Sequence, residues 1–263
     1  MKPTVAVIPA AGLGTRMRPA TRVIPKAFLP LIDRPAVQYA VEEATAAGAT
    51  EVFVVVDPEA ADLIEGYFSE PLPGLEAVTV SPVSQPEPRG LGDAVASVAA
   101  EVGSRPFMCM LVDELLRPGF EVFDKLNAAA GNGSAVAVRT IDNPEHLSRY
   151  GVVAVGDESN GSFSITGAIE KPPVGTAPSN LALVGRYVFQ PAIFEALAGI
   201  EPGHGGEIQL TDAIDAIAAD CRAVVVDDAL VDIGHPLGMA KAMHLLALEH
   251  PEWSDEYQGF VRG

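Results

Sequence analysis

The stretch TVAVIPAAGLGTRMRPATRVIPKAFLP, residues 4–30, joins an apolar, β-branched run to a basic loop punctuated by glycines. Residues 4–9 predict a buried strand, which ends where the small residues begin. A glycine-rich turn after the first strand of a doubly wound sheet lies at the carboxyl end of that strand, where ligands bind, and its free N–H groups suit phosphates. The stretch therefore predicts the start of an α/β fold and an anion-binding loop.

Charge is distributed unevenly along the chain. The formal net charge is −18, yet Asp33 is the only acid in the first 34 positions. The acidic balance argues against nucleic-acid or membrane partners, because both are polyanions. We therefore expect a small polyanionic ligand near the N-terminus, held by basic residues drawn from Lys2, Arg16, Arg18, Arg22, Lys26 and Arg34.

Length and hydropathy favour one cytoplasmic domain. At 263 residues the chain suffices for one large α/β core. No apolar run reaches the roughly 18 residues that span a bilayer, and we expect no signal peptide. We expect a single domain over 1–263, with lobes at about 1–131 and 132–263. Cys109 and Cys221 lie in apolar segments and are predicted to be buried, reduced thiols.

Strands and helices alternate through the first half, which favours a parallel sheet with helices on both faces. Asp33 is expected to cap the first helix, and Gly48 is expected to close it. The second half has strand-like runs separated by turns, which implies an antiparallel or mixed extension. We expect further strands at 51–57, 75–80, 106–113, 134–140, 151–155, 162–170, 181–189, 222–226 and 229–233, and further helices at 58–68, 92–102, 209–219 and 236–250, with another beyond Gly119.

The glycine loop fits neither of two common nucleotide motifs. A dinucleotide fingerprint needs glycine or alanine where Met17 stands, and a Walker A loop needs Gly-Lys-Ser/Thr after the last glycine. Residues 7–55 instead resemble bacterial UTP–glucose-1-phosphate uridylyltransferases nearly residue for residue. The likeness continues, in the family's order, in QPEPRGLGDAV (85–95), EKPPVGTAPSNLALVGRYVF (170–189) and GEIQLTDAI (206–214).

The resemblance implies a fold, a reaction and an assembly. The fold is a Rossmann-like doubly wound, mostly parallel or mixed sheet with a small antiparallel sugar-side extension. The reaction is attack by a sugar 1-phosphate, here α-D-glucose 1-phosphate, on the α-phosphorus of UTP, with Mg²⁺ as cofactor. The products are UDP-glucose and pyrophosphate. A homo-oligomer, dimer or tetramer, is expected.

The resemblance places nucleotide binding in the loop and in a second segment. Arg16 is expected to grip the triphosphate and Lys26 to draw the phosphates together, both as catalytic residues. Gln85 is expected to pair with the edge of uracil. The implied nucleotide-binding residues are Ala10, Ala11, Gly12, Gly14, Thr15, Arg16, Lys26, Gln85 and Gly90.

The resemblance also implies a metal site and a sugar-phosphate site. Asp113 and Asp232 match the two acidic positions expected to hold Mg²⁺, and Asp113 counts as catalytic. Lys171 is expected to meet the sugar phosphate, also as a catalytic residue. The implied sugar-phosphate-binding residues are Gly151, Glu170, Lys171, Val184 and Gly185.

The chain departs from the family pattern in places, and two alternatives stay open. Asp93 stands where the family has histidine, Val112 replaces the usual proline, and the segments after Phe68 and Asp113 are short. One alternative is a pyrophosphorylase for another pair of substrates, such as dTTP with a different sugar 1-phosphate. The other is a catalytically silent regulatory paralogue.

Overall fold

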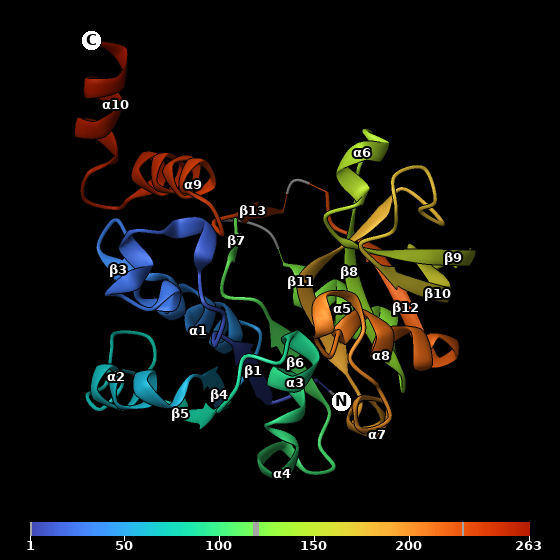
Figure 1. Ribbon diagram of the computed structural model, residues 1–263. Helices are drawn as coiled ribbons and strands as arrows, with labels where there is room; N and C mark the ends of the chain where they lie inside the picture. Colours follow the sequence, from blue (N-terminus) through green and yellow to red (C-terminus); the bar gives the residue numbers. More distant parts are fainter. Residues whose placement is uncertain (1, 118–120, 228) are drawn as a thin grey trace.

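A nine-stranded sheet forms the centre of the computed structural model, which describes residues 2–117, 121–227 and 229–263 (Figure 1). Its strands are β1 (Val5–Pro9), β4 (Glu51–Val56), β5 (Thr79–Ser84), β6 (Phe107–Met110), β8 (Ser134–Thr140), β9 (Gly151–Ser159), β10 (Ser162–Glu170), β11 (Leu181–Phe189) and β12 (Cys221–Val225). The order is β5-β4-β1-β6-β11-β8-β12-β10-β9.

The sheet changes character at β11. Strands β5, β4, β1 and β6 are parallel, as the alternation of strands and helices predicts. Strand β11 runs antiparallel to both β6 and β8, and β9 and β10 form an antiparallel pair at the far edge. The mixed α/β fold with an antiparallel extension is confirmed. The β6–β11 pairing joins the two expected lobes in one sheet, and their division at residue 131 stays a prediction.

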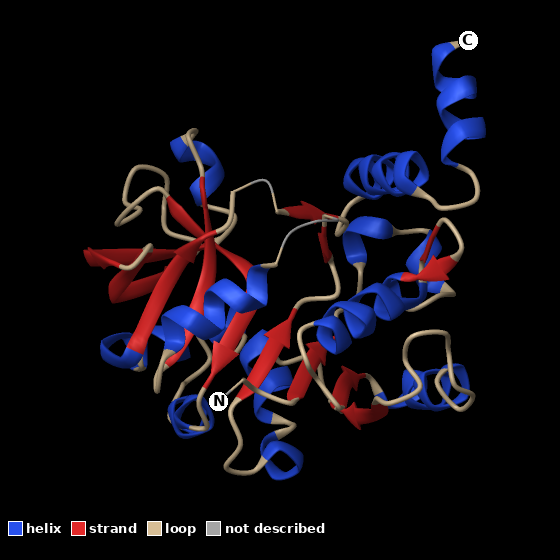
Figure 2. Ribbon diagram, turned by 180° about the vertical axis from the view of Figure 1, so that it is seen from behind, coloured by secondary structure: helices blue, strands red, loops and turns tan. Residues whose placement is uncertain are grey.

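Helices cover both faces of the sheet. Ala6 and Ile8 of β1 pack into one core and Val5 and Val7 into another, because successive side chains of a strand point to opposite faces. In Figure 2 the helices of the first face lie in front of the sheet, and in Figure 1 those of the second face do. The first face carries α1 (Ala36–Ala46), α2 (Ala61–Tyr67) and α5 (Val122–Ala130), and the second α3 (Leu91–Ala96), α4 (Ala99–Val102), α7 (Ala192–Ala198) and α8 (Leu210–Ala216).

Two short ladders and three further helices lie outside the main sheet. Strands β7 (Glu114–Leu116) and β13 (Leu230–Asp232) form an antiparallel pair, and so do β2 (Pro30–Leu31) and β3 (Arg34–Pro35). The helices are α6 (Pro144–Leu147), α9 (Pro236–Glu249) and α10 (Ser254–Arg262). Helix α10 projects from the body of the molecule at the C-terminus (Figure 1). Within the described ranges, no helix is both long and apolar enough to cross a membrane.

The expected cap of the first helix is wrong. Asp33 lies in the turn between β2 and β3, so that α1 begins only at Ala36 and Pro35 takes the N-cap position. Ile32 adopts a φ of 65° in this turn. The carboxylate of Asp33 instead accepts a hydrogen bond from Arg34 Nε at 3.1 Å.

Three other expected elements also differ from the structure. The strand expected at 75–80 begins only at Thr79 and is β5, because residues 72–78 form turns. Thr79 is the residue that pairs with Glu51. The helix expected at 92–102 is two helices, since Val98 leaves helical geometry. The strand expected at 106–113 ends at Met110, which leaves Asp113 in a loop.

Candidate active site

The glycine loop after β1 has a shape fixed by one packing contact. Gly14 has a φ of +57°, and a Cβ there would lie 2.9 Å from Thr21 Cγ2. The Thr21 hydroxyl donates a hydrogen bond to the Gly14 carbonyl at 2.7 Å. Only glycine combines this backbone conformation with such a close approach. The loop is therefore held open as a concave backbone surface.

A cavity of about 450 Å³ lies against this loop. Its walls come from the loop, from residues 85–94, from the loop that carries Asp113 and from Glu207. Among the expected nucleotide-binding residues, those that line it are Ala10, Ala11, Gly12, Gly14, Thr15, Lys26, Gln85 and Gly90. Arg16 lies beside it, with a largely exposed side chain whose Nη2 is 3.8 Å from Asp113 Oδ2.

The amide of Gln85 is fixed by protein contacts. Its Nε2 donates to Gly90 O at 3.2 Å and to Asp93 Oδ2 at 2.7 Å. Asp93 is held in turn by Arg89, whose Nη2 donates to Asp93 Oδ1 at 2.6 Å. Both amide hydrogens are thus engaged inside the protein, so that Oε1 is the atom left to accept a hydrogen bond from a base. Asp93, which replaces the family's histidine, therefore orients Gln85.

Gly90 closes the cavity wall through close backbone contact. It has a φ of +108°, and a Cβ there would lie 2.6 Å from Ile208 O. The two segments are joined by hydrogen bonds from Gly92 N to Ile208 O at 2.9 Å and from Ile208 N to Arg89 O at 2.8 Å. The segment before α8 thereby becomes part of the cavity, which no local sequence pattern indicated.

Asp113 is the point where the expected phosphate-binding cations converge. Lys26 Nζ donates to Asp113 Oδ2 at 2.6 Å, and the Lys26 side chain is 13% exposed. A cationic ammonium that is held this close and largely withdrawn from water is well placed to meet phosphate oxygens entering the cavity.

The two expected metal ligands lie side by side. Asp232 pairs with Glu114 in the β7–β13 ladder, and Ile233 N donates to Asp113 O at 2.7 Å. The point that a Cβ of Gly234 would occupy is 3.1 Å from Asp113 Oδ2 and 2.9 Å from Asp232 Oδ1. Glycine thus leaves a gap between two carboxylates.

The two carboxylates are donors of the kind that a hard divalent cation prefers. Carboxylate oxygens are the ligands that Mg²⁺ prefers, and Mg²⁺ is commonly held by one or two carboxylates plus substrate phosphates. Within residues 2–117, 121–227 and 229–263, no group of three or more His, Cys, Asp or Glu side chains could hold a metal. Substrate and water would therefore have to complete the coordination between Asp113 and Asp232.

Glu114, next to Asp113, is a partly buried acid whose Oε2 atom is withdrawn from solvent. Burial raises the pKa of its carboxyl group to about 7, since the charged form loses water. Its Oε2 atom has no hydrogen-bond partner among the described residues. The sequence left Glu114 open as a helper of the metal site or as a solvent-facing residue, and the structure shows that its Oε2 atom does not face solvent.

The expected sugar-phosphate residues form a second cluster. Gly151 begins β9 opposite Glu170, the last residue of β10. Glu170 Oε1 lies 3.0 Å from Lys171 Nζ, and its Oε2 accepts a hydrogen bond from Thr211 Oγ1 at 2.6 Å. A Cβ on Gly151 would lie 2.5 Å from that hydroxyl oxygen. The side chains of Thr211, Leu183 and Glu170 thus pack over the bare backbone of Gly151.

Lys171 adopts an unusual backbone conformation. Its φ is 44°, in the left-handed region that side chains other than glycine rarely enter, and its N–H donates to Tyr150 O at 3.0 Å. Such conformations persist where the surrounding structure fixes them, and they cluster at functional sites.

The two remaining sugar-side residues, both in β11, lie apart from this cluster. Gly185 packs beneath Leu111, which lines the nucleotide cavity and donates to Gly185 O at 2.8 Å. Val184 is buried and lines a different cavity, together with Arg139 and Leu230. Among the described residues, Gly151, Glu170, Lys171, Val184 and Gly185 do not line the nucleotide cavity itself. The segment 207–211 links the two clusters, because Glu207 lines the cavity and Thr211 holds Glu170.

Several residues outside the expected set support the site. Arg89 and Asp93 form an i,i+4 ion pair, a spacing that the sequence does display. Arg186 is an arginine inside an apolar strand, which is a visible signal of a buried charge. Its partner, Glu43, carried no such signal, since it lies 143 positions away in the chain.

Comparison with known proteins shows the family of this chain. The nucleotidyl transferase family model matches residues 5–249. The chain belongs to this family. It is 36% identical to UTP–glucose-1-phosphate uridylyltransferase 1 of Staphylococcus saprophyticus, over 100% of this chain and 99% of that protein. It is also 36% identical to a Streptococcus pyogenes UTP–glucose-1-phosphate uridylyltransferase, over 97% of this chain and 92% of the relative.

Solved structures with ligands are similar as well. A UDP-glucose pyrophosphorylase complexed with UDP-glucose matches with a TM-score of 0.86 and 33% identity, covering 94% of this chain and 99% of that one. A UTP-bound enzyme of the same kind from Acinetobacter baumannii has a TM-score of 0.86 and 33% identity, covering 98% of each chain. The family resemblance seen in the sequence blocks is confirmed.

Proposed function

We propose that this nucleotidyl transferase makes UDP-glucose and pyrophosphate from UTP and α-D-glucose 1-phosphate. Its relatives are named UTP–glucose-1-phosphate uridylyltransferase, and the similar solved structures contain UTP or UDP-glucose. The observation that carries the proposal is the meeting of Lys26 and Arg16 with Asp113 at a glycine-lined cavity. Cations and carboxylates at one cavity are what the joining of two anionic reactants requires.

The proposed reaction needs alignment rather than covalent help from the protein. A phosphate oxygen of the sugar 1-phosphate forms a bond to the α-phosphorus, and the bond from the α-phosphorus to the bridging oxygen of the β-phosphate breaks. The electron pair leaves with pyrophosphate, so that no proton transfer is required. Arg16 and Lys26 neutralise charge on the nucleotide phosphates, and Lys171 holds the sugar phosphate for attack.

Mg²⁺ is part of this proposal. Asp113 and Asp232 would hold it, and when bound it supplies positive charge that neutralises the phosphate oxygens during transfer. Gln85 accepts a hydrogen bond from uracil through Oε1, and the small residues 10–12 admit the flat base. We further propose a homo-oligomer, and a cytoplasmic location stays a prediction.

A substrate matrix tests the proposal. The purified protein is assayed with UTP, dTTP, ATP, CTP and GTP against glucose 1-phosphate and other sugar 1-phosphates, with and without Mg²⁺, and pyrophosphate is measured. We expect the highest kcat/KM with UTP and glucose 1-phosphate. A uracil pocket discriminates against the extra methyl group of thymine by about 1–3 kcal/mol. A higher kcat/KM with another pair would reject the stated substrates, and no turnover with any pair would favour the silent paralogue.

A further inference from the structure

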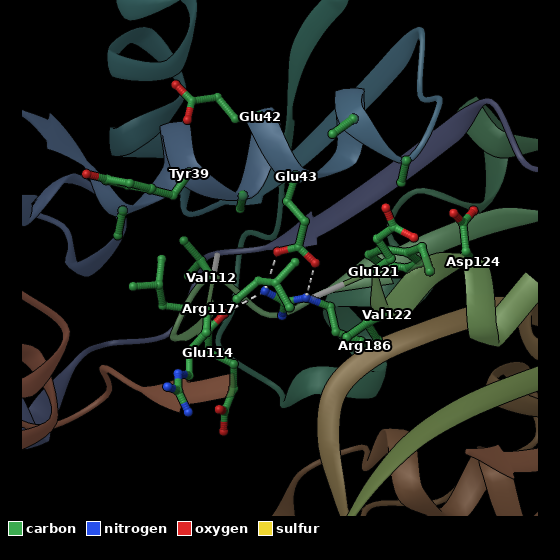
Figure 3. A pocket seen from close by; sticks show the side chains of 17 residues that line it. Tyr39, Glu42, Glu43, Val112, Glu114, Arg117, Glu121, Val122, Asp124 and Arg186 are labelled. Carbon is green, nitrogen blue, oxygen red and sulfur yellow. Dashed lines mark hydrogen bonds and ion pairs between the residues drawn. The ribbon is translucent and has the colours of Figure 1, made fainter. Parts of the chain in front are cut away.

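The side chain of Arg186 is buried beneath the loop that carries Asp113, and every one of its N–H donors is used. Its side chain is 1% exposed and forms a two-point ion pair with Glu43, at 2.6 Å and 2.7 Å (Figure 3). The other donors reach Gly185 O at 2.8 Å, Leu111 O at 3.1 Å and Glu114 O at 2.6 Å. The guanidinium group therefore has no donor left for a substrate.

Two of these acceptors flank the catalytic aspartate. Leu111 and Glu114 are the residues on either side of the Val112–Asp113 pair, so one planar group binds both ends of the short segment. Glu43 belongs to α1, which anchors the guanidinium group to a helix packed on the sheet. The planar guanidinium group of arginine donates several hydrogen bonds in fixed directions and so can bind several acceptors at once. The ammonium group of lysine is a single point of charge.

Val112 shows how close this support lies to the nucleotide cavity. It lines both that cavity and a second cavity of about 360 Å³ that contains Arg186 and Glu43 in its wall (Figure 3). The ion pair and the nucleotide site are thus separated by one layer of side chains. If the hydrogen bonds of Arg186 shifted, the backbone on both sides of Val112 and Asp113 would shift with them.

Stability alone does not explain a buried ion pair at this place. Replacing such pairs by well-packed apolar residues is often neutral or stabilising, because burial of the charges costs most of what the attraction returns. We propose that Arg186, oriented by Glu43, is a positioning residue that sets the place of Asp113 for the transfer reaction. This inference rests on the proposed function, since it concerns the turnover of the same site.

Substitution of Arg186→Lys tests the proposal in the whole protein. Lysine keeps the charge and loses the fork, so we expect kcat to fall about 100-fold, the loss that misplacement by about 1 Å can cause. The KM for the nucleotide should change much less than kcat, because no hydrogen bond of Arg186 reaches residues 10–15 or Gln85. Arg105→Lys is the matched control, since Arg105 forms an ion pair with Glu51 far from the cavity, and it should leave kcat unchanged.

A double-mutant cycle separates positioning from general structural support. In an Asp113→Asn background, Arg186→Lys should cause no further loss of kcat, because it acts only through Asp113. A purely structural role would lower kcat by the same factor in both backgrounds. Glu43→Gln keeps the shape of Glu43 and weakens its hold on Arg186, so it serves as a second variant should Arg186→Lys fail to fold.

The outcomes are distinct. Unchanged kcat in folded Arg186→Lys and Glu43→Gln, or a full additive loss in the Asp113→Asn background, would overturn the positioning role. A wild-type protein without turnover on any substrate pair would instead contradict the proposed function. Thermal unfolding of each variant reports the folded fraction on which the comparison depends.

Discussion

At the scale of single residues, a substitution of Gly234 tests the gap between the carboxylates of Asp113 and Asp232. The Cβ of Gly234→Ala would lie 2.7 Å from Arg16 Nη2 and about as close to Asp232 Oδ1 and Asp113 Oδ2, at 2.9 Å and 3.1 Å. We expect turnover to fall about 100-fold, because the methyl group displaces the groups proposed to bind the phosphates and the cation. Steady-state assays over a range of Mg²⁺ concentrations measure the effect.

Gly66→Ala is the control for this substitution. Gly66 lies in helix α2, and nothing is within 4 Å of the position of its Cβ. Alanine should leave turnover unchanged and stabilise the protein by about 0.5–1 kcal/mol, since glycine is the poorer helix former. Equal activity of both glycine variants would contradict the role assigned to the gap.

Lys171→Ala tests the sugar-phosphate cluster. We expect kcat/KM for the sugar 1-phosphate to fall by about 100–1,000-fold, the range found when one charge-stabilising group is removed. The fold should survive, because the Lys171 side chain is partly exposed and has one ion-pair partner, Glu170. Circular dichroism checks the fold, and wild-type kinetics of this variant would refute the assignment.

At the scale of elements, the strands of the sheet determine the reactivity of the thiols. Cys109 in β6 and Cys221 in β12 are both buried and free, as the apolar segments predict. Burial raises the pKa of each thiol to about 12, because the thiolate would lose water. We expect no reaction with a thiol reagent at pH 8 in the native state and two thiols per chain after denaturation. Rapid native labelling would contradict this burial.

Also at this scale, the sequence predicted elements well where the apolar pattern is continuous and poorly at their ends. The strand in residues 51–57 and the helix after Pro35 are found, because alternation and helical spacing are local signals. The strand predicted from Leu75 onward was placed too early, since a turn residue can bury its side chain without joining the sheet. The loop position of Asp113 was missed for a similar reason, as Leu111 and Val112 extend the apolar run past the strand.

At the scale of the whole molecule, we propose that exposed apolar side chains of α10 take part in a subunit contact. Leu237, at the start of α9, is 63% exposed. In α10, Phe260 is 80% exposed and Val261 51%. Single exposed apolar residues are ordinary, but several on projecting helices are typical of interfaces.

Phe260→Glu tests this expectation. A charge at the centre of an apolar contact loses its hydration on association, so we expect the variant to dissociate toward monomers at concentrations where the wild type is a dimer or tetramer. Sedimentation velocity measures the states. A monomeric wild type, or an oligomer indifferent to the substitution, would contradict the proposed assembly surface.

The sequence by itself determined the class of fold and the glycine loop, because strand patterns and close glycine turns are encoded over short stretches. The residues expected at the site came from the resemblance to a known family. Tertiary structure alone decided which of these meet. Lys26 reaches Asp113 across 87 positions, and Arg186 reaches Glu43 across 143. No local pattern specifies such contacts, since they depend on the spatial order of the strands in the sheet. The chain thus encodes its parts locally, and the fold brings them into a nucleotide cavity and a second cluster that residues 207–211 join.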